Sequence, residues 1–284
     1  MSARFPDVLL PSPPRVGTGG RMRLAKKVAL VTGGGTGIGA ATARLFASEG
    51  ASVVVTGRRS GPVAAVAEEI DGIAVPGDTS DPVHVAQAVD AAVSTYGGLD
   101  VLVASAGVGF EGAVGDMDVD AWDRTLDINL NGPMLVSRAA LPFMLERGGG
   151  SIVLVSSTSG MASAPASAAY DVSKAALIGL ARSIAVSYGP HRIRANALCP
   201  GWVTSPMGDE DMDALGASLG LSREEAYRLA TEDVPLRRPV SPEEMAACCL
   251  FLASDESSSV TGTTLVADGG GQAVELTSKA FGLE

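Results

Sequence analysis

A run of glycines between two apolar segments constrains the fold of this chain more than any other feature. Residues 27–32 (KVALVT) are apolar and rich in β-branched side chains, which is typical of a buried strand. The glycine-rich stretch 33–39 (GGGTGIG) follows, and apolar residues then recur at helical spacing as far as Gly50. A second apolar strand is predicted at 52–56. The order strand, glycine turn, helix, strand indicates a turn whose backbone approaches a phosphate at a helix N-terminus.

The spacing of this turn leaves a second interpretation open. The glycines follow the pattern T-G-x-x-x-G-x-G from Thr32 to Gly39 rather than G-x-G-x-x-G. A tight turn that is merely rich in glycine would give a similar pattern, although each glycine inside an element costs roughly 0.5–1 kcal/mol relative to alanine. Motifs further along the chain decide between the two.

The rest of the chain alternates between strand and helix patterns. This alternation predicts a single α/β domain with a doubly wound, seven-stranded parallel sheet and helices on both faces. Ligands of such sheets bind beyond the carboxyl ends of the strands. We expect strands at 28–32, 52–56, 73–76, 100–104, 151–156, 193–198 and 264–267, and helices at 38–49, 61–70, 82–96, 120–146, 168–188, 206–231 and 242–253.

The first residues of the chain have a different composition. The stretch 1–22 holds four prolines and three glycines and has no continuous apolar run of the kind a signal peptide needs. We therefore expect residues 1–23 to be a flexible extension, residues 24–284 to form the domain, and Met22 to be a candidate natural start.

Charge and cysteine content exclude several function classes. The chain carries 21 basic and 32 acidic residues, a net charge of −11, which argues against a nucleic-acid partner or an anionic membrane surface. No apolar run reaches membrane-spanning length. Cys199, Cys248 and Cys249 lack the spacing of a metal site, so we expect no metal, buried thiols, and a reducing, cytoplasmic location.

A serine, a tyrosine and a lysine in the second half of the chain have catalytic spacing. Ser156 and Ser157 end a predicted strand, and Tyr170 and Lys174 follow on a predicted helix, where positions i and i+4 share a face. An ammonium beside a phenol lowers the phenol pKa from its reference of about 10 and makes it a usable general acid or base. A lone Tyr-x-x-x-Lys pair also occurs by chance on many helices, so the pair counts only with its context.

With these motifs in place, residues 24 to about 270 resemble the short-chain dehydrogenase/reductase family. The resemblance implies a single Rossmann-type domain that uses a nicotinamide cofactor, with the glycine turn at its pyrophosphate. The matching pieces are TGGGTGIG (32–39), GDTSD (77–81), ASAG (104–107), DINLNG (127–132), VSSTSG (155–160), YDVSK (170–174), CPGWV (199–203) and the VTG…ADGG ending (260–270).

The resemblance implies four catalytic residues. Tyr170 is expected to exchange a proton with the substrate oxygen, and Ser157 to donate a hydrogen bond to the same oxygen. Lys174 is expected to bind the nicotinamide ribose and to lower the Tyr170 pKa. Asn129 is expected to hold a water that relays protons from Lys174.

The resemblance also implies a cofactor-binding set. Asp78 is expected to accept a hydrogen bond from the adenine amino group, and the segment after the sixth strand to flank the nicotinamide amide. ASAG stands where the family usually has N-N-A-G, so we expect slightly weaker local structure at Ala104 and Ser105. The full set is Gly33, Thr36, Gly37, Ile38, Gly39, Arg58, Asp78, Thr79, Ala106, Gly107, Tyr170, Lys174, Pro200, Gly201, Val203 and Ser205.

Two arginines after the second strand bear on the choice of cofactor. NAD-preferring members usually have an acidic residue at the end of this strand, where this chain has Gly57 followed by Arg58 and Arg59. A guanidinium there can hold a 2′-phosphate, which favours NADP(H). A solvated turn is the alternative, and Thr36 stands where many NADP enzymes have a basic residue.

The sequence says less about the substrate. The loop at about 205–235 is expected to hold it, with an apolar lining from Trp202, Met207, Met212, Leu215 and Leu219 and with its acidic residues in solvent. We expect an oxidoreductase acting on a small to medium neutral ketone or alcohol. The alternatives are a 3-oxoacyl thioester reductase, an isomerase or dehydratase, and a non-catalytic NADP-binding regulator. A serine hydrolase would need His84 or His191 as base, and neither lies near these motifs.

Two long helices are expected to serve assembly. The predicted helices 120–146 and 168–188 resemble the pair that family members use for subunit packing, usually in homotetramers. Small residues would allow close approach there: Ala139, Ala140, Ala175, Ala176, Gly179 and Ala181.

Overall fold

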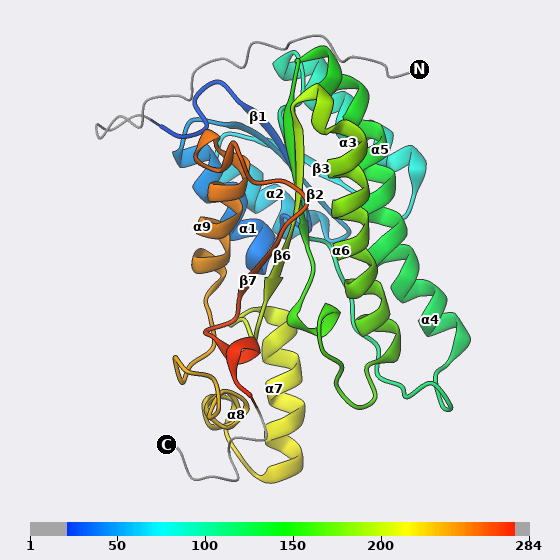
Figure 1. The fold of residues 1–284 in the computed structure, drawn as a ribbon, viewed down its shortest axis with the longest axis vertical. Helices are drawn as coiled ribbons and strands as arrows, with labels where there is room; N and C mark the ends of the chain where they lie inside the picture. Colours follow the sequence, from blue (N-terminus) through cyan, green and yellow to red (C-terminus); the bar gives the residue numbers. More distant parts are fainter. Residues whose placement is uncertain (1–21, 276–284) are drawn as a thin grey trace, which may run out of the picture.

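The computed structural model describes residues 22–275, which form one α/β domain of three layers (Figure 1). The sheet has seven strands, all parallel, in the order β3-β2-β1-β4-β5-β6-β7, so the predicted fold class is confirmed. The strands are β1 (Val28–Thr32), β2 (Ser52–Gly57), β3 (Ile73–Pro76), β4 (Val101–Ala104), β5 (Gly150–Val155), β6 (Ile193–Pro200) and β7 (Thr264–Ala267).

Helices cover both faces of the sheet. One face packs against α3, α5 and α6, and the other against α1, α2 and α9. The helices are α1 (Gly37–Ser48), α2 (Ser60–Glu69), α3 (Pro82–Tyr96), α4 (Val119–Leu126), α5 (Gly132–Glu146), α6 (Ala168–Tyr188), α7 (Pro206–Leu219), α8 (Arg223–Ala230) and α9 (Pro242–Ala253).

Each strand contributes alternate residues to the two faces, which is why both cores exist. In β1, Leu30 packs against the α3, α5 and α6 side, whereas Ala29 and Val31 pack against the α1, α2 and α9 side. A strand that is buried on both faces reads as a continuous apolar run, as the VALVT sequence of β1 does.

The strand order reverses between β1 and β4, because the chain runs outward from β1 to β3 and then crosses back to β4. The carboxyl ends of β1 and β4 therefore form the switch point at which ligands of such sheets bind. In Figure 1, α7 and α8 lie beyond the same end of the sheet.

Two predicted helices are interrupted. The predicted helix 120–146 is α4, a π-helical turn (Asp127–Asn131) and α5. The predicted helix 206–231 is divided into α7 and α8 at Gly220, which has φ +73°. A glycine in the left-handed region ends a helix, and the apolar periodicity on its two sides hid this break.

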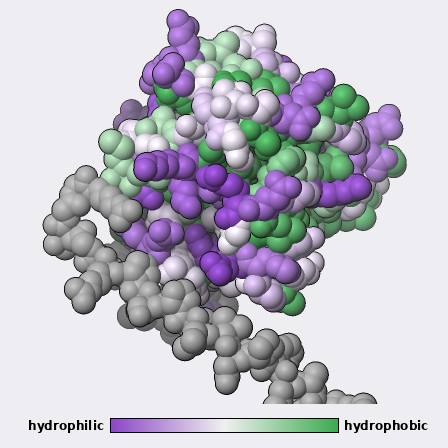
Figure 2. All heavy atoms as spheres, turned by 90° about the horizontal axis from the view of Figure 1, so that it is seen from above, coloured by the Kyte–Doolittle hydropathy of each residue, from purple (hydrophilic) through white to green (hydrophobic). Residues whose placement is uncertain are grey.

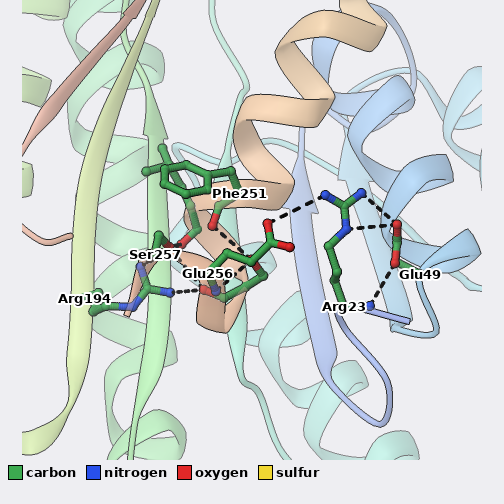
Figure 3. Close-up of polar contacts among 8 residues, drawn as sticks. Arg23, Glu49, Arg194, Phe251, Glu256 and Ser257 are labelled. Carbon is green, nitrogen blue, oxygen red and sulfur yellow. Dashed lines mark hydrogen bonds and ion pairs between the residues drawn. The ribbon is translucent and has the colours of Figure 1, made fainter. Parts of the chain in front are cut away.

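The opposite end of the sheet is held by ion pairs and a hydrogen-bond network. Figure 2 shows the molecule from this end, where hydrophilic residues lie among hydrophobic ones. Arg23 pairs with Glu49 at 2.7 Å and with Glu256 at 3.8 Å (Figure 3). The proposed extension 1–23 was therefore wrong at its last residue, because Arg23 is bonded to the domain; residues 1–21 lie outside the described part of the chain.

Arg194, near the start of β6, forms the network beside these pairs (Figure 3). Its guanidinium donates to the carbonyl oxygens of Leu252 at 2.8 Å and Ser254 at 3.0 Å, and to the Ser257 hydroxyl at 2.7 Å. A longer hydrogen bond of 3.4 Å reaches the Val260 carbonyl. This arginine joins β6 to the chain that follows α9.

Within residues 22–275, no helix is long and apolar enough to cross a membrane. In the same range, His, Cys, Asp and Glu side chains form no group of three or more that could hold a metal ion.

Candidate active site

The glycine turn after β1 packs directly on the segment after β4. Gly33 has φ +66°, and a Cβ atom at this position would lie 2.8 Å from the backbone nitrogen of Ala106. A Cβ atom at Gly39 would lie 2.3 Å from the carbonyl oxygen of Gly33. Both distances are too short for any side chain, so the turn requires glycine at these two positions.

The turn leads into the N-terminus of α1. Its N-cap residue, Thr36, makes no side-chain capping hydrogen bond, and the first turn (Gly37, Ile38, Gly39) carries no acidic side chain. Helices leave their first N–H groups without partners inside the helix, so these donors are available to an anion. The geometry fits a phosphate group better than an ordinary tight turn.

Two arginines after β2 take different directions. Arg59 Nη2 donates to Thr36 Oγ1 at 3.1 Å, so its guanidinium lies against the glycine turn. Arg58 is exposed and contributes to a lower pKa at Asp78. The sequence singled out Arg58, yet the structure places the Arg59 guanidinium at the turn, against Thr36.

Asp78 follows β3 and is held in a turn. Its Oδ1 accepts hydrogen bonds from the Ser80 backbone nitrogen at 3.0 Å and the Ser80 hydroxyl at 2.8 Å. Burial acts to raise the pKa of Asp78, but these hydrogen bonds and the charges of Arg58 and Arg124 outweigh it, so the pKa is lowered. Asp78 is an anionic acceptor. Its neighbour Thr79 is buried against Gly132.

The segment after β4 connects the glycine turn to the catalytic candidates. The Thr32 hydroxyl accepts from the backbone nitrogens of Ser105 at 3.1 Å and Ala106 at 3.3 Å. These two hydrogen bonds hold the segment after β4 to the end of β1. They do so in the ASAG stretch, which was expected to be weaker because it lacks amide side chains. A Cβ atom at Gly107 would lie 3.5 Å from both Asn129 Oδ1 and Lys174 Nζ, so a side chain at this position would contact both groups.

Asn129 is fully buried in the π-helical turn between α4 and α5. Its Oδ1 accepts from the Val108 backbone nitrogen at 2.8 Å. Its Nδ2 donates to the Val108 carbonyl at 2.8 Å and the Ser173 hydroxyl at 3.1 Å. The side chain therefore ties the segment after β4 to α6, and the relay water expected at Asn129 stays a prediction.

Ser157 and Tyr170 come together although twelve residues lie between them in the sequence. Ser157 follows β5, where its Oγ accepts from the Ser159 backbone nitrogen at 3.1 Å. Tyr170 lies in the first turn of α6, and the Ser157 side chain is near enough to its phenol to lower the phenol pKa. The Ser156 hydroxyl donates to the Lys174 carbonyl at 2.7 Å and so pins the end of β5 to α6.

Lys174 lies one helical turn after Tyr170 and is only 4% exposed. Its Nζ donates to the Val155 carbonyl at 2.9 Å and lies 5.4 Å from the centre of the Tyr170 ring. Among the described residues, Val155 is the one hydrogen-bond partner of this ammonium group. Two of its three N–H groups are left for a ligand.

The expected lowering of the Tyr170 pKa is wrong for the protein without cofactor. Burial raises the pKa of Tyr170 to about 12, and the Ser157 hydrogen bond, rather than Lys174, opposes this rise. Burial also lowers the pKa of Lys174 to about 8. The physical reason is that both groups lose water, and the ammonium lies against the ring of Tyr170.

The segment after β6 closes the site on the side of the glycine turn. Gly201 donates its backbone N–H to the Ala267 carbonyl at 3.3 Å, next to Pro200 at the end of β6. Val203 is buried and pairs with Val240. Ser205 is the N-cap of α7, and its Cβ atom would lie 3.3 Å from a Cβ atom at Gly37.

The expected pocket lining is partly wrong. Met212 is 1% exposed and packs with Leu215 in the small core between α7 and α8, so these two side chains do not face a substrate. Trp202 and Met207, at 41% and 40% exposure, remain available to a ligand. The sequence missed Tyr227, a buried side chain of α8 whose hydroxyl reaches Val203.

Three acidic residues of α7 (Glu210, Asp211 and Asp213) are exposed, as expected, whereas Asp209 is half-buried. Asp209 and Asp213 both pair with Arg223, at 3.1 and 2.5 Å. Burial raises the pKa of Asp211, and the carboxylates of Glu111 and Glu210 add to the rise.

Neither histidine can serve Ser157 as a base. The Nε2 of His84 is 2.7 Å from the Thr56 hydroxyl, in the core beside β2. His191 lies in the turn before β6, at the opposite end of that strand from the site.

Known proteins resemble this chain over most of its length. The model of the family described as "Enoyl-(Acyl carrier protein) reductase" matches residues 33–272. "Protein MoaE" of Klebsiella aerogenes is 43% identical over 256 residues, which are 90% of this chain and 99% of that protein. The human "Dehydrogenase/reductase SDR family member 4" is 38% identical over 256 residues, covering 87% of this chain and 88% of that protein.

A solved structure agrees with the fold. It is the crystal structure of a short-chain type dehydrogenase/reductase from Mycobacterium marinum, with a TM-score of 0.79 and 33% identity. The match covers 89% of this chain and 98% of that chain. The chain therefore belongs to the short-chain dehydrogenase/reductase family, a family of NAD(P)-dependent oxidoreductases.

Proposed function

We propose that this protein interconverts a ketone and an alcohol by hydride transfer with NADP(H), using Tyr170 as general acid and base. The observation that carries the proposal is the meeting of Ser157, Tyr170 and Lys174 beside the glycine turn, at the switch point of the sheet. With its pKa raised to about 12, Tyr170 holds its proton at neutral pH and can give it to a carbonyl oxygen.

Each catalytic candidate then has a part in the reaction. During reduction Tyr170 gives its phenolic proton to the substrate oxygen, and Ser157 donates a hydrogen bond to the same atom. Lys174 uses one N–H group on Val155, so its other two are free to bind ribose hydroxyls. Asn129 fixes the backbone at Val108 beside Lys174.

The residues at the turn fit a nicotinamide dinucleotide. The uncapped N-terminus of α1 suits the pyrophosphate, and Asp78 is an anionic acceptor for the adenine amino group. When bound, the cofactor supplies or takes up the hydride. The backbone of Gly201 and Val203 would hold the nicotinamide amide, and Ser205 lies beside Gly37.

A preference for NADP(H) rests on the two arginines. The end of β2 has Gly57 in place of an acidic side chain, and both Arg58 and Arg59 follow it. The Arg59 guanidinium lies on Thr36 at the glycine turn, where its positive charge suits a 2′-phosphate.

The substrate is a small to medium ketone or alcohol without charge. Trp202 and Met207 offer exposed apolar side chains at the mouth of the site. The family description favours a second candidate, a thioester on an acyl carrier protein. Glu210 and Asp211 on α7 make this candidate less favourable, because their carboxylates would repel an anionic carrier protein.

The outer face of α5 and α6 supports a homotetramer. A groove there is lined by apolar side chains that include Met134, Leu145 and Leu180. Two of the small residues expected at this interface, Ala140 and Ala181, are fully buried in the core and take no part. Light scattering at micromolar concentration tests this assembly, and a monomer would refute it.

The free thiols support the expected location. Cys199 and Cys249 are buried and unpaired, as in a protein of the reducing cytoplasm.

A cofactor absorbance assay tests the reaction class. We expect ketones to oxidise NADPH more efficiently than NADH, and neutral ketones to react faster than 3-oxoacyl thioesters. Loss of absorbance with thioesters alone would favour the second candidate. A protein that binds NADPH and turns over neither class would refute the enzymatic proposal.

A further inference from the structure

The helices α7 and α8 form a small unit with its own core. Met212 of α7 packs with Ala226 and Tyr227 of α8, apart from the two cores that flank the sheet. In Figure 1 the pair lies beyond the carboxyl end of the sheet, next to the candidate active site. Its position relative to the site therefore depends on the contacts that attach it.

The hydroxyl of Tyr227 is such a contact. Tyr227 is 6% exposed, and its Oη lies 3.1 Å from the Val203 carbonyl oxygen and 3.0 Å from Asp209 Oδ1. Val203 belongs to the segment after β6, and Asp209 to the first turn of α7. One oxygen atom thus joins three parts of the chain.

Gly208 shows how tightly these parts meet. A Cβ atom at this position would lie 2.3 Å from the Val203 carbonyl oxygen and 2.7 Å from Tyr227 Oη. Gly208 has no positive φ, so a close approach rather than a left-handed backbone explains the glycine. The first turn of α7 is pressed onto the same two atoms that form the hydrogen bond.

Both neighbours of the phenol are acceptors. A phenol has one proton, so Tyr227 donates to the Val203 carbonyl or to the Asp209 carboxylate at any moment. Burial raises the pKa of Tyr227, and the hydrogen bond to Asp209 raises it further, so the proton stays on the phenol. Arg223 holds the other oxygen of Asp209 at 3.1 Å, which keeps the carboxylate in place.

The segment that receives this hydrogen bond is fixed on its other side as well. Val240 donates its backbone N–H to the Trp202 carbonyl at 2.8 Å and accepts from Thr204 at 3.0 Å. The carbonyl of Val203 is left to Tyr227. Tyr227 therefore completes the support of the backbone that flanks the nicotinamide amide in the proposed function.

We propose that Tyr227 is a positioning residue that locks α7 and α8 onto the Val203 segment and so couples cofactor binding to the placement of the substrate loop. This inference rests on the proposed function. Tyr227 touches no reacting atom, so it acts through Val203 and Asp209.

The test is Tyr227→Phe, which keeps the ring in the small core and removes the hydroxyl. We expect the Kd for NADPH, measured by fluorescence, to rise about five- to tenfold, as for the loss of one buried hydrogen bond. In the protein without cofactor, amide hydrogen exchange over residues 206–212 should become faster. The kcat should stay within about twofold, so the effect falls on binding.

Two further variants make the test specific. Asp213→Asn breaks an ion pair of the same Arg223 without touching Tyr227, and it should leave the Kd and the exchange unchanged. Gly208→Ala keeps Tyr227 but its methyl group forces α7 away from the Val203 carbonyl and the phenol, so both the Kd for NADPH and the rate of hydrogen exchange should rise. This variant provides the test if Tyr227→Phe does not fold.

The outcomes separate the two proposals. If the parent protein binds NADPH and Tyr227→Phe has the same Kd and the same hydrogen exchange, the role of Tyr227 is refuted. The proposed function would not be affected by that result. A parent protein that binds neither NADPH nor NADH would overturn the proposed function and this inference with it.

Discussion

Arg194 and Lys174 are two cations with little exposure to solvent at opposite ends of the sheet, and comparing them distinguishes a structural group from a functional one. Arg194 at the amino end donates to four acceptors, which are the oxygens of Leu252, Ser254, Ser257 and Val260. Lys174 at the carboxyl end is more deeply buried, and Val155 is its one acceptor among the described residues.

Burial lowers the pKa of both groups, and this shared effect does not separate them. The difference lies in the number of protein acceptors around each cation, which is four for Arg194 and one for Lys174 among the described residues. Burying a charge is costly unless its hydrogen bonds are made, so an incompletely satisfied ammonium indicates a site shaped for a ligand. Arg194 is surrounded by four acceptors that belong to the fold, whereas Lys174 has one and keeps two N–H groups without a partner among the described residues.

The largest expected effect comes from removing the two cations. Lys174→Met should lower turnover at least about 10²-fold and change the free energy of unfolding little, because a buried charge is removed with its own desolvation cost. Arg194→Met should lower the free energy of unfolding by about 3 kcal/mol, because it leaves several buried acceptors unpaired. Its folded fraction should keep a kcat within about twofold.

Urea unfolding and steady-state kinetics on both variants check this contrast. If Lys174→Met destabilises the protein while keeping its turnover, the two ends have been assigned the wrong way round.

A second contrast concerns arginines on the surface. Arg59→Ala should raise the KM for NADPH about tenfold, because the guanidinium that lies on Thr36 is the group proposed to bind the 2′-phosphate. Arg23→Ala removes two surface ion pairs at the far end of the sheet. It should leave the KM unchanged and change the free energy of unfolding by no more than about 1 kcal/mol. Steady-state kinetics with NADPH and with NADH test this contrast. An equal rise in the KM for both cofactors would show that Arg59 does not bind the 2′-phosphate.

A smaller effect is expected from pH. The folded protein lowers the Lys174 pKa from 10.5 to about 8, so between these values the unfolded chain binds the proton and the native protein does not. Stability contributed by Lys174 is therefore present above about pH 10.5 and is lost as the pH falls through about 8. The stability of the parent relative to Lys174→Met should rise by about 1 kcal/mol or more from pH 7.5 to 10.

Urea unfolding of both cofactor-free proteins at the two pH values measures this change. If the stability of the parent relative to Lys174→Met is constant or falls as the pH rises, burial does not lower the Lys174 pKa.

The smallest effect is expected at the N-terminus. Deletion of residues 1–21 should leave the melting temperature and the turnover unchanged, since Arg23 and its ion pairs remain. Thermal unfolding and kinetics of the shortened protein check this expectation. A fall of many degrees would mean that the domain uses these residues.

The sequence predicted most of the fold because its signals are local. The apolar runs marked all seven strands to within two residues, and Gly33 to Gly39 marked the turn. The interruptions of the two long helices were missed, because periodicity continues through the π-helical turn and across Gly220.

The candidate site was predictable only where a motif carried it. The family resemblance predicted that Ser157 and Tyr170 lie together, and in the structure the Ser157 side chain acts on the Tyr170 phenol. Tyr227 belongs to no motif and acts through long-range packing. A glycine inside a helical pattern, Gly208, was the one local sign of that contact.

The pKa values could not be predicted from spacing. The i, i+4 arrangement of Tyr170 and Lys174 predicted a lowered phenol pKa, but burial depends on the whole fold and acts in the opposite direction. Spacing tells which groups are neighbours, whereas the balance of burial and charge needs the structure.

The central claim is that Tyr170 gives the proton to the substrate oxygen, and single-turnover hydride transfer in Tyr170→Phe tests it most directly. The phenyl ring keeps its packing, so the Kd for NADPH and the melting temperature should match those of the parent. The rate of NADPH oxidation by a ketone should fall by about 10²–10⁴-fold, the usual contribution of general acid–base catalysis. A variant that binds NADPH normally and reduces the ketone at the parent rate would contradict the account.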